Sequence, residues 1–307
     1  MGTRADLAIA EVNRLGHGAF SRAEALAVGH SPKSIRYRLE AGLWERLYPT
    51  VYCVAGSPDY WMRNQSAACK WMKGVASHRA AGHLWGLPGC ENPPIEVLTA
   101  TNNVMPHTDV RVHRTKRLPE SQLTVVNRIP CTTIERTLMD LCGHFGDRRE
   151  SAIAVDDALR RGLTTLGALD HCLYLTARRG RNGCGILRKI VHSRMRTSVP
   201  PHSPLESVIY DVIERSHLLM PRLQFTIRDT HGAFIARPDF VYLDEKLVVQ
   251  GHSKKWHWGE AAESKDLDQH NRLGALGFRI VYVTWADATR YPDRLVATID
   301  AHLRAAA

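Results

Sequence analysis

A carboxylate, an amide and two histidines occur close together between Arg237 and His257. Apolar residues recur at every second position on both sides of Asp244-Glu245-Lys246, which predicts two strands joined by a turn. This hairpin would place Asp239 beside Gln250 and His252. A carboxylate near imidazoles can hold a hard divalent cation and accept a proton from water at one phosphodiester. The spacing therefore predicts a metal-dependent site for a phosphodiester.

A second carboxylate, Glu206, belongs to the first turn of a helix that Ser203 is predicted to cap. Taken alone, a carboxylate in this position usually interacts with the helix dipole, which is worth less than about 1 kcal/mol. From Ser203 onward the expected order is helix, three strands, helix, strand and helix. This order is typical of a small α/β domain.

A basic helix is predicted near the N-terminus, from Pro32 to Ala41, with Ser31 as its N-cap. The β-rich segment Leu43–Val54 follows and is broken by Pro49, as in the wing of a winged helix-turn-helix. A basic helix face alone is more often a solvated surface, but helix, turn, basic helix and wing together favour DNA binding. The expected contacts to grooves or phosphates are Lys33, Ser34, Arg36, Tyr37 and Arg38.

The chain has 307 residues, which favours two or three domains. The predicted class is multi-domain α/β, with a winged helix at 1–55, a middle α/β domain at 56–198 and a nuclease-like domain at 199–307. Lys and Arg number 41 against 31 Asp and Glu, a formal charge of +10 that favours a polyanionic partner such as duplex DNA. A further basic segment adds three candidate phosphate contacts, Arg178, Arg179 and Arg181.

The seven cysteines form no C-x-x-C pair and lie mostly among apolar residues, which predicts reduced, buried thiols, a cytoplasmic location and no structural zinc. No apolar run has the length of a signal peptide or a membrane span, and no organic cofactor is expected. Ser77 is predicted to cap a helix. His78, His83 and His113 would be ligands only if they converged in space, so they are not included in the predicted site.

The motifs after Ser203 resemble a nuclease superfamily. Pro238-Asp239, ten further residues and the Gln250-x-His252 position are similar to the PD-(D/E)xK pattern. With Phe240 and Trp256-His257 included, residues 203–286 more closely resemble the very-short-patch mismatch repair endonucleases and the related DUF559 group.

The nuclease resemblance implies a role for each matching residue. Asp239 and the carbonyl of Gly251 would bind Mg²⁺ or Mn²⁺, and His257 or His252 would activate water or stabilise the developing charge. Glu206 would support the metal-bound waters. Further DNA contacts near the site would be Lys254, Lys255 and Trp256, the last by stacking on bases.

Two positions depart from that pattern. The DUF559-like proteins ordinarily have glutamate at the position of Gln250, and frequently aspartate at that of His252. Three explanations stay open for Gln250: a histidine-assisted variant of the site, a naturally silent nuclease fold, or a glutamate replaced to trap an inactive form. The zinc ligands of the mismatch enzymes are also missing, which argues against mismatch specificity.

The N-terminal two thirds resemble the AbiEi-type antitoxins of type IV toxin–antitoxin systems, whose winged helix represses its own operon. The similar segments are Gly18–Ala27, the basic helix, Leu47–Tyr52, Ser77–Ala81 and Ile129–Asp140. Two functions follow: a metal-dependent DNA endonuclease or nickase, in defence or repair, or an AbiEi-like repressor or antitoxin with a catalytically silent nuclease fold. The expected partners are duplex DNA and either a cognate toxin or a second copy of the chain, with no membrane. A scaffold without nucleic-acid function would show no salt-dependent affinity for DNA.

Overall fold

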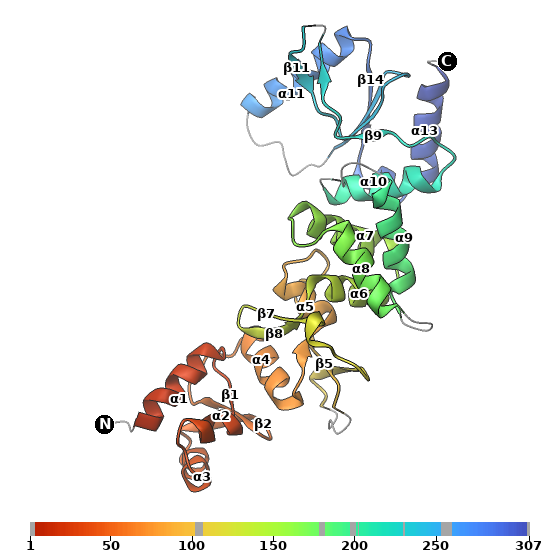
Figure 1. Ribbon diagram of the computed structural model, residues 1–307. Coiled ribbons are helices and arrows are strands. Elements are labelled where there is room, and N and C mark those ends of the chain that lie inside the picture. The colour runs from red at the N-terminus through yellow and green to blue at the C-terminus, as the bar shows by residue number, and fades with distance from the viewer. Residues whose placement is uncertain are drawn as a thin grey trace. The chain divides into compact units, whose positions relative to one another are not determined.

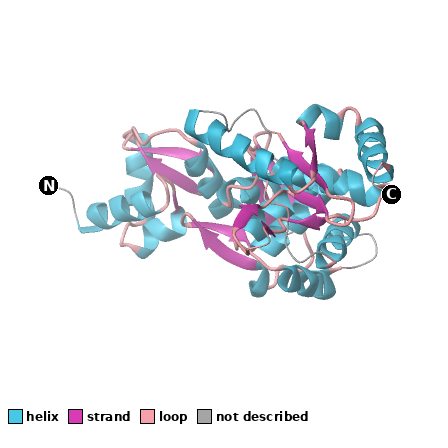
Figure 2. Ribbon diagram, turned by 90° about the horizontal axis from the view of Figure 1, so that it is seen from above, coloured by secondary structure: helices cyan, strands magenta, loops and turns pink. Residues whose placement is uncertain are grey.

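The computed structural model describes residues 4–101, 107–177, 182–196, 201, 203–229, 231–252 and 260–305, and of residues 260–266 only the backbone. The chain divides into two compact units, Met1–His144 and Phe145–Ala307. Both units combine helices and strands, as Figure 2 shows. The boundaries after residues 55 and 198 remain predictions. None of the helices in the described ranges is both long enough and apolar enough to cross a lipid bilayer.

The first unit begins with three helices and a small antiparallel sheet of strand order β1-β3-β2 (Figure 1). Ser21 and Glu24 form the expected capping box, and Ser31 caps the basic helix as predicted. Ile35 from that helix packs with Phe20 and Trp44 in one apolar cluster, which fixes the helix against the sheet. The elements are α1 (Arg4–Leu15), β1 (Phe20–Ser21), α2 (Arg22–Ala27), α3 (Pro32–Glu40), β2 (Trp44–Tyr48) and β3 (Val51–Val54).

The rest of the first unit surrounds a five-stranded mixed sheet of order β6-β5-β4-β8-β7. Small side chains of α4, including Ala67 and Ala68, pack with Val97 and Ile129 of this sheet. The elements are α4 (Trp61–Met72), β4 (Val75–Ala76), α5 (His78–Leu84), β5 (Ile95–Thr99), β6 (Val110–Arg114), the 3-10 helix η1 (Glu120–Gln122), β7 (Leu123–Val126), β8 (Ile129–Thr132) and α6 (Ile134–Phe145). Six of the seven cysteines of the chain are buried, as predicted.

The second unit begins with four helices, and a buried ionic cluster joins three of them. Arg194 has no exposed side-chain surface, and its Nε and Nη2 donate to the two carboxylate oxygens of Asp156 at 2.9 and 2.8 Å. Its Nη1 lies 3.5 Å from Asp211, and its guanidinium lies 4.1 Å from the centre of the Tyr210 ring. The cluster thus ties together three of the helices α7 (Arg148–Arg160), α8 (Leu166–Thr176), α9 (Cys184–Met195) and α10 (Pro204–Arg215).

A mixed sheet of order β14-β13-β12-β9 completes the second unit. Both faces are covered: Phe240 and Val249 pack with α10 and α13, whereas Val241 and Val248 pack on the side of α11. Figure 1 shows α11 and α13 on opposite sides of this sheet. The elements are β9 (Arg222–Leu223), β10 (Ile227–Arg228), β11 (Phe234–Ala236), β12 (Phe240–Tyr242), β13 (Leu247–Gly251), α11 (Glu260–Ala275), β14 (Arg279–Val283), α12 (Trp285–Thr289) and α13 (Pro292–Arg304).

Replacing the buried arginine should destabilise the second unit. In Arg194→Leu the carboxylates of Asp156 and Asp211 lose their central cation, and we expect the free energy of unfolding to fall by about 3–5 kcal/mol. Urea titration followed by circular dichroism measures this change. Arg188→Leu, an exposed arginine of the same helix, is the control and should change stability by less than about 0.5 kcal/mol. Equal losses in the two variants would contradict a structural role for the cluster.

Candidate functional site

Helix α3 presents an exposed face with two cations and an aromatic ring. Lys33, Arg36 and Tyr37 are exposed, and 63% of the surface of Tyr37 is accessible to solvent. Lys and Arg contact phosphates and base edges, and an exposed tyrosine can donate to a phosphate oxygen. These three predicted residues are therefore brought together on one surface.

The other two residues predicted on α3 have partners within the protein. Arg38 donates to Asp6 of α1 at 2.5 Å and to the Ser34 hydroxyl, and its guanidinium lies 5.6 Å from the centre of the Trp44 ring. Ser34 also contacts His30. These contacts hold α3 against α1 and β2, so Arg38 and Ser34 position the helix.

The second unit brings Glu206 and Asp239 together through one amide group. Gln224 donates from Nε2 to Glu206 at 2.9 Å and to Asp239 at 3.2 Å. Gln224 has a φ of 50°, an uncommon left-handed conformation for a residue with a side chain, and its N–H donates to the Asp239 carbonyl. Nothing in the sequence indicates this bridging role, because a lone glutamine after a two-residue strand matches no motif.

The predicted hairpin is confirmed, with Phe240 paired to Val249 and Tyr242 paired to Leu247. Asp239 lies beside Gln250, whose side-chain oxygen accepts from the Asp239 N–H at 3.2 Å. The Oδ1 atom of Asp239 accepts from Gln224, and its Oδ2 atom accepts from the Gly251 N–H at 2.8 Å.

His252 is exposed, and its ring lies edge-on to Tyr282 with centroids 6.1 Å apart. Several residues predicted to contact DNA or act on phosphate lie outside the described residues, namely His257, Lys254, Lys255, Trp256, Arg178, Arg179 and Arg181.

Burial and the charge of Glu206 raise the pKa of Asp239 to about 7, against an ordinary value near 3.8. The hydrogen bonds from Gly251, Gln224 and Gln250 act in the opposite direction. Two close carboxylates commonly hold one proton up to neutral pH for this reason.

The side-chain atoms of Asp239 and Glu206 that could bind a metal are carboxylate oxygens. Oxygen ligands suit Mg²⁺ better than softer metals. Two carboxylates that share one amide donor fit a cation that keeps several of its waters. A Cβ at Gly251 would come within 3.3 Å of both Asp239 and Leu205, so a side chain here would press on the carboxylate. Within the described part of the chain, no group of three His, Cys, Asp or Glu side chains forms a metal site.

A buried cluster in the first unit was not expected from the sequence. His78 and His113 stack with ring centroids 3.5 Å apart, and His113 lies 3.5 Å from the buried carboxylate of Glu96. Burial lowers the pKa of His78 to about 4, so this ring is neutral. His83 lies against Trp61 instead, so two of the three histidines converge.

The cap predicted for α5 comes from a different residue. The Ser77 side chain makes no capping hydrogen bond. Instead the Glu96 carboxylate accepts from the Arg79 and Ala80 N–H groups at 2.8 and 3.4 Å. The expectation was wrong because a residue distant in sequence supplies the acceptor.

One protein family matches the N-terminal part of the chain. Residues 8–55 match a family described as transcriptional regulators, the AbiEi antitoxins. This segment contains most of α1 and all of α2, α3 and the β1-β3-β2 sheet. The predicted AbiEi resemblance is therefore confirmed for these residues, whereas the nuclease resemblance of residues 203–286 remains a prediction.

Two uncharacterized proteins of Mycobacterium tuberculosis, from strains CDC 1551 and H37Rv, are similar to this chain. Each is 31% identical over 157 residues, which cover 51% of this chain and 56% of the relative. The chain thus spans little more than half the length of the curated relatives that it matches.

The raised pKa of Asp239 predicts a specific pH dependence of stability. The folded state keeps a proton that the unfolded carboxyl has lost, so the wild-type protein loses stability as the pH rises from about 4 to 7. Asparagine does not titrate. Between pH 5 and pH 8, the free energy of unfolding of Asp239→Asn should therefore rise relative to wild type by about 2 to 3 kcal/mol.

Urea titrations at pH 5, 6.5 and 8 would measure this difference. Asp244→Asn, an exposed aspartate in the turn of the same hairpin, is the control and should follow the wild-type curve. Parallel curves for Asp239→Asn and wild type would show that the carboxylates do not share a proton.

Proposed function

We propose that this protein is a DNA-binding transcriptional regulator of the antitoxin type, whose N-terminal winged helix binds duplex DNA through α3. The match of residues 8–55 to the AbiEi regulators carries this proposal. The arrangement of α2, α3 and the β2–β3 hairpin supports it, because a helix-turn-helix with a wing places its second helix in the major groove.

The exposed side chains of this part have the chemistry that DNA requires. Lys33 and Arg36 lie on the free face of α3. Arg46 in the hairpin is also exposed, with its guanidinium 5.8 Å from the centre of the Tyr52 ring. The net charge of +10 adds a general attraction to phosphates. A cognate toxin or a second copy of the chain would be a further partner, and regulation of its own operon is what the antitoxin resemblance implies.

The carboxylate pair favours a second candidate function, metal-dependent hydrolysis of DNA in the second unit. Glu206 and Asp239 share the Gln224 amide, and Asp239 has a raised pKa beside Glu206. A bound Mg²⁺ would polarise a phosphodiester and make a water more acidic. Asp239 would hold this cation with the Gly251 carbonyl, Glu206 would orient the waters, and His252 or His257 would accept a proton. Gln250 already accepts from the Asp239 N–H and contributes no charge.

Charge reversal on α3 should weaken DNA binding. For Lys33→Glu and Arg36→Glu, we expect weaker binding to the DNA upstream of the coding sequence, and a salt dependence whose slope falls by about 1 for each phosphate contact removed. Fluorescence anisotropy at several salt concentrations would measure both. Lys116→Glu removes an exposed cation outside residues 8–55 and is the control. Unchanged binding in both α3 variants would refute the proposed interface.

Metal binding gives a test of the second candidate that does not depend on activity. At pH 8, millimolar Mg²⁺ or Mn²⁺ should raise the melting temperature of the wild-type protein by a few degrees, about 2 °C or more for each kcal/mol of binding. Asp239→Asn and Glu206→Gln should abolish this shift, and Asp244→Asn should keep it.

Supercoiled plasmid with the same metals tests the chemistry itself. Nicking that is lost in Asp239→Ala and increased in Gln250→Glu would support hydrolysis. DNA binding without nicking, by both the wild-type chain and Gln250→Glu, would exclude it and leave a regulator with a silent nuclease-like domain.

A further inference from the structure

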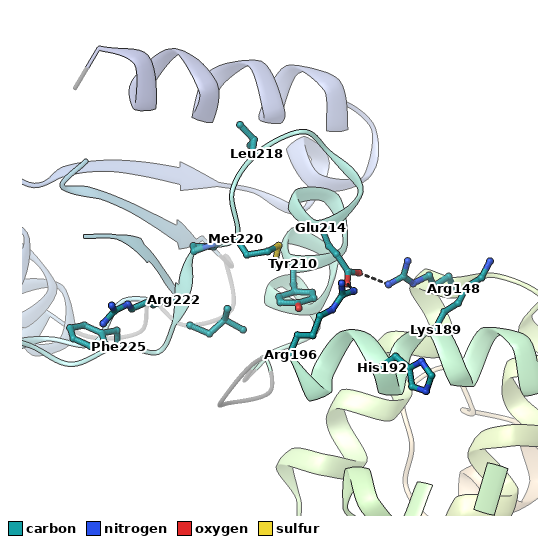
Figure 3. A pocket seen from close by; sticks show the side chains of 12 residues that line it. Arg148, Lys189, His192, Arg196, Tyr210, Glu214, Leu218, Met220, Arg222 and Phe225 are labelled. Carbon is teal, nitrogen blue, oxygen red and sulfur yellow. Dashed lines mark hydrogen bonds and ion pairs between the residues drawn. The ribbon is translucent and has the colours of Figure 1, made fainter. Parts of the chain in front are cut away.

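The second unit contains a cavity of about 980 Å³ between α9, α10 and the chain leading into β9. Figure 3 shows Lys189 at one end of its lining and Arg222 with Phe225 at the other. Glu214 lies between these ends and pairs with Arg196 at 2.9 Å. The cations are thus separated and partly neutralised, so no single anionic group can contact Lys189 and Arg222 together.

Hydrogen-bond donors are concentrated instead at one end of the four-stranded sheet. Asp239 directly precedes β12, and Gln250 and Tyr282 lie near the carboxyl ends of β13 and β14. Because β12 is antiparallel to β13 and β14 is parallel to it, all three residues belong to the same end of the sheet. Neighbouring strands are about 5 Å apart, so Gln250 lies between Asp239 and Tyr282, whose strands are separated by about 10 Å.

Gln250 and Tyr282 also share one face of the sheet. They are paired in the parallel register of β13 and β14, as are Val248 and Ile280. Val248 and Ile280 pack in the apolar cluster on the side of α11. Side chains two residues apart on a strand project to the same face. His270 of α11 lies 2.8 Å from the Tyr282 hydroxyl, which agrees with this placement.

The amide group of Gln250 has unused donors. Its Oε1 atom accepts from the Asp239 N–H at 3.2 Å. A backbone N–H can only donate, so this contact assigns the oxygen to the side of Asp239 and leaves the Nε2 atom with its two N–H groups. In the part of the chain that the structure describes, no hydrogen bond uses this Nε2 atom. The amide can therefore donate to an acceptor beside the carboxylate pair.

The hydroxyl of Tyr282 is held in place by an imidazole. Its Oη atom lies 2.8 Å from Nδ1 and 3.0 Å from Nε2 of His270, and 46% of the surface of Tyr282 is accessible to solvent. A neutral imidazole carries one N–H, and a hydroxyl has one proton and two lone pairs. When the ring donates to Oη, the hydroxyl can donate to a second group. His270 is therefore a positioning residue for this hydroxyl.

We propose that Gln250 Nε2 and Tyr282 Oη donate to one phosphate group beside the carboxylate pair. Glutamine and tyrosine side chains are common donors to the phosphates of nucleic acids. In place of the glutamate of the nuclease pattern, the amide adds two donors and removes a charge that would repel phosphate. The proposal names phosphate contacts for the second candidate function, hydrolysis of DNA, and rests on that function for its substrate.

Fluorescence anisotropy of the full chain with a labelled thymidylate tetramer, in EDTA, tests this contact without metal. Gln250→Glu keeps an acceptor for the Asp239 N–H but sets a negative charge against the phosphate, so binding should weaken by about tenfold or more. Tyr282→Phe removes one hydrogen bond and should weaken binding by about two- to tenfold.

The role of His270 is tested by combining variants. Once His270→Ala has released the hydroxyl, Tyr282→Phe should cause little further loss of affinity, because the two residues act as one unit. His270→Gln retains an N–H and should keep most of the affinity. Losses that simply add, or an equal loss in His270→Gln and His270→Ala, would refute the positioning role.

Controls separate this contact from general electrostatic or folding effects. Asn271→Asp places the same charge on an exposed position of α11, and Tyr291→Phe removes the hydroxyl of another exposed tyrosine. Both variants should bind the tetramer as the wild type does. Circular dichroism and urea unfolding would verify that each variant is folded. In ¹⁵N NMR spectra, the side-chain amide signals of Gln250, identified by their absence in Gln250→Glu, should shift when the tetramer is added.

Inorganic phosphate distinguishes the two sources of the phosphate group. Tighter binding of the tetramer assigns the contact to a strand, and equal affinity assigns it to free phosphate. If Mg²⁺ leaves the melting temperature unchanged while tetramer binding depends on Gln250 and Tyr282, the metal site fails and the phosphate contact stands. If the Gln250 amide signals do not move and Gln250→Glu binds as tightly as Asn271→Asp, the contact is refuted whatever the metal does.

Discussion

The contact of Arg194 with Asp156 and Asp211 is the interaction on which the carboxylate pair and the cavity of the second unit depend. It joins α9, α7 and α10 without exposure to water, and a buried charge is tolerated only where its partners are held in place. Helix α10 carries Glu206 at its start and Tyr210 and Glu214 further along. Fixing this helix therefore fixes one carboxylate of the pair and one side of the cavity.

The two units use charge in different ways. On α3 the cations stand on a solvated helix surface, where their interaction with phosphates is long-ranged and sensitive to salt. In the second unit Glu206 and Asp239 lie in a partly buried site, where burial and mutual repulsion keep a proton on the pair. The first arrangement suits recognition of a polyanion, and the second suits the binding of a cation or a proton.

Arg38 illustrates how a sequence pattern can place a residue correctly and leave its partner within the protein unknown. The basic residues of α3 were predicted as one group of DNA contacts. The structure divides them, because Asp6 is distant in sequence yet adjacent in space and binds Arg38. Glu96 shows the same effect: it caps α5 and approaches His113, since β5 and β6 pair in parallel with Leu98 opposite His113. Local spacing contains no information on such pairings.

The sequence by itself determined the elements whose signals are local. Capping residues and apolar periodicity located α2, α3 and α10, and alternation around Asp244-Glu245-Lys246 located the hairpin that puts Asp239 beside Gln250. Only the tertiary structure decided which distant groups meet: Gln224 between the two carboxylates, Arg194 between its aspartates, and the cations around one cavity. The reason is physical, because burial and long-range contacts set the charge state and partners of these side chains, and both arise only when the elements pack.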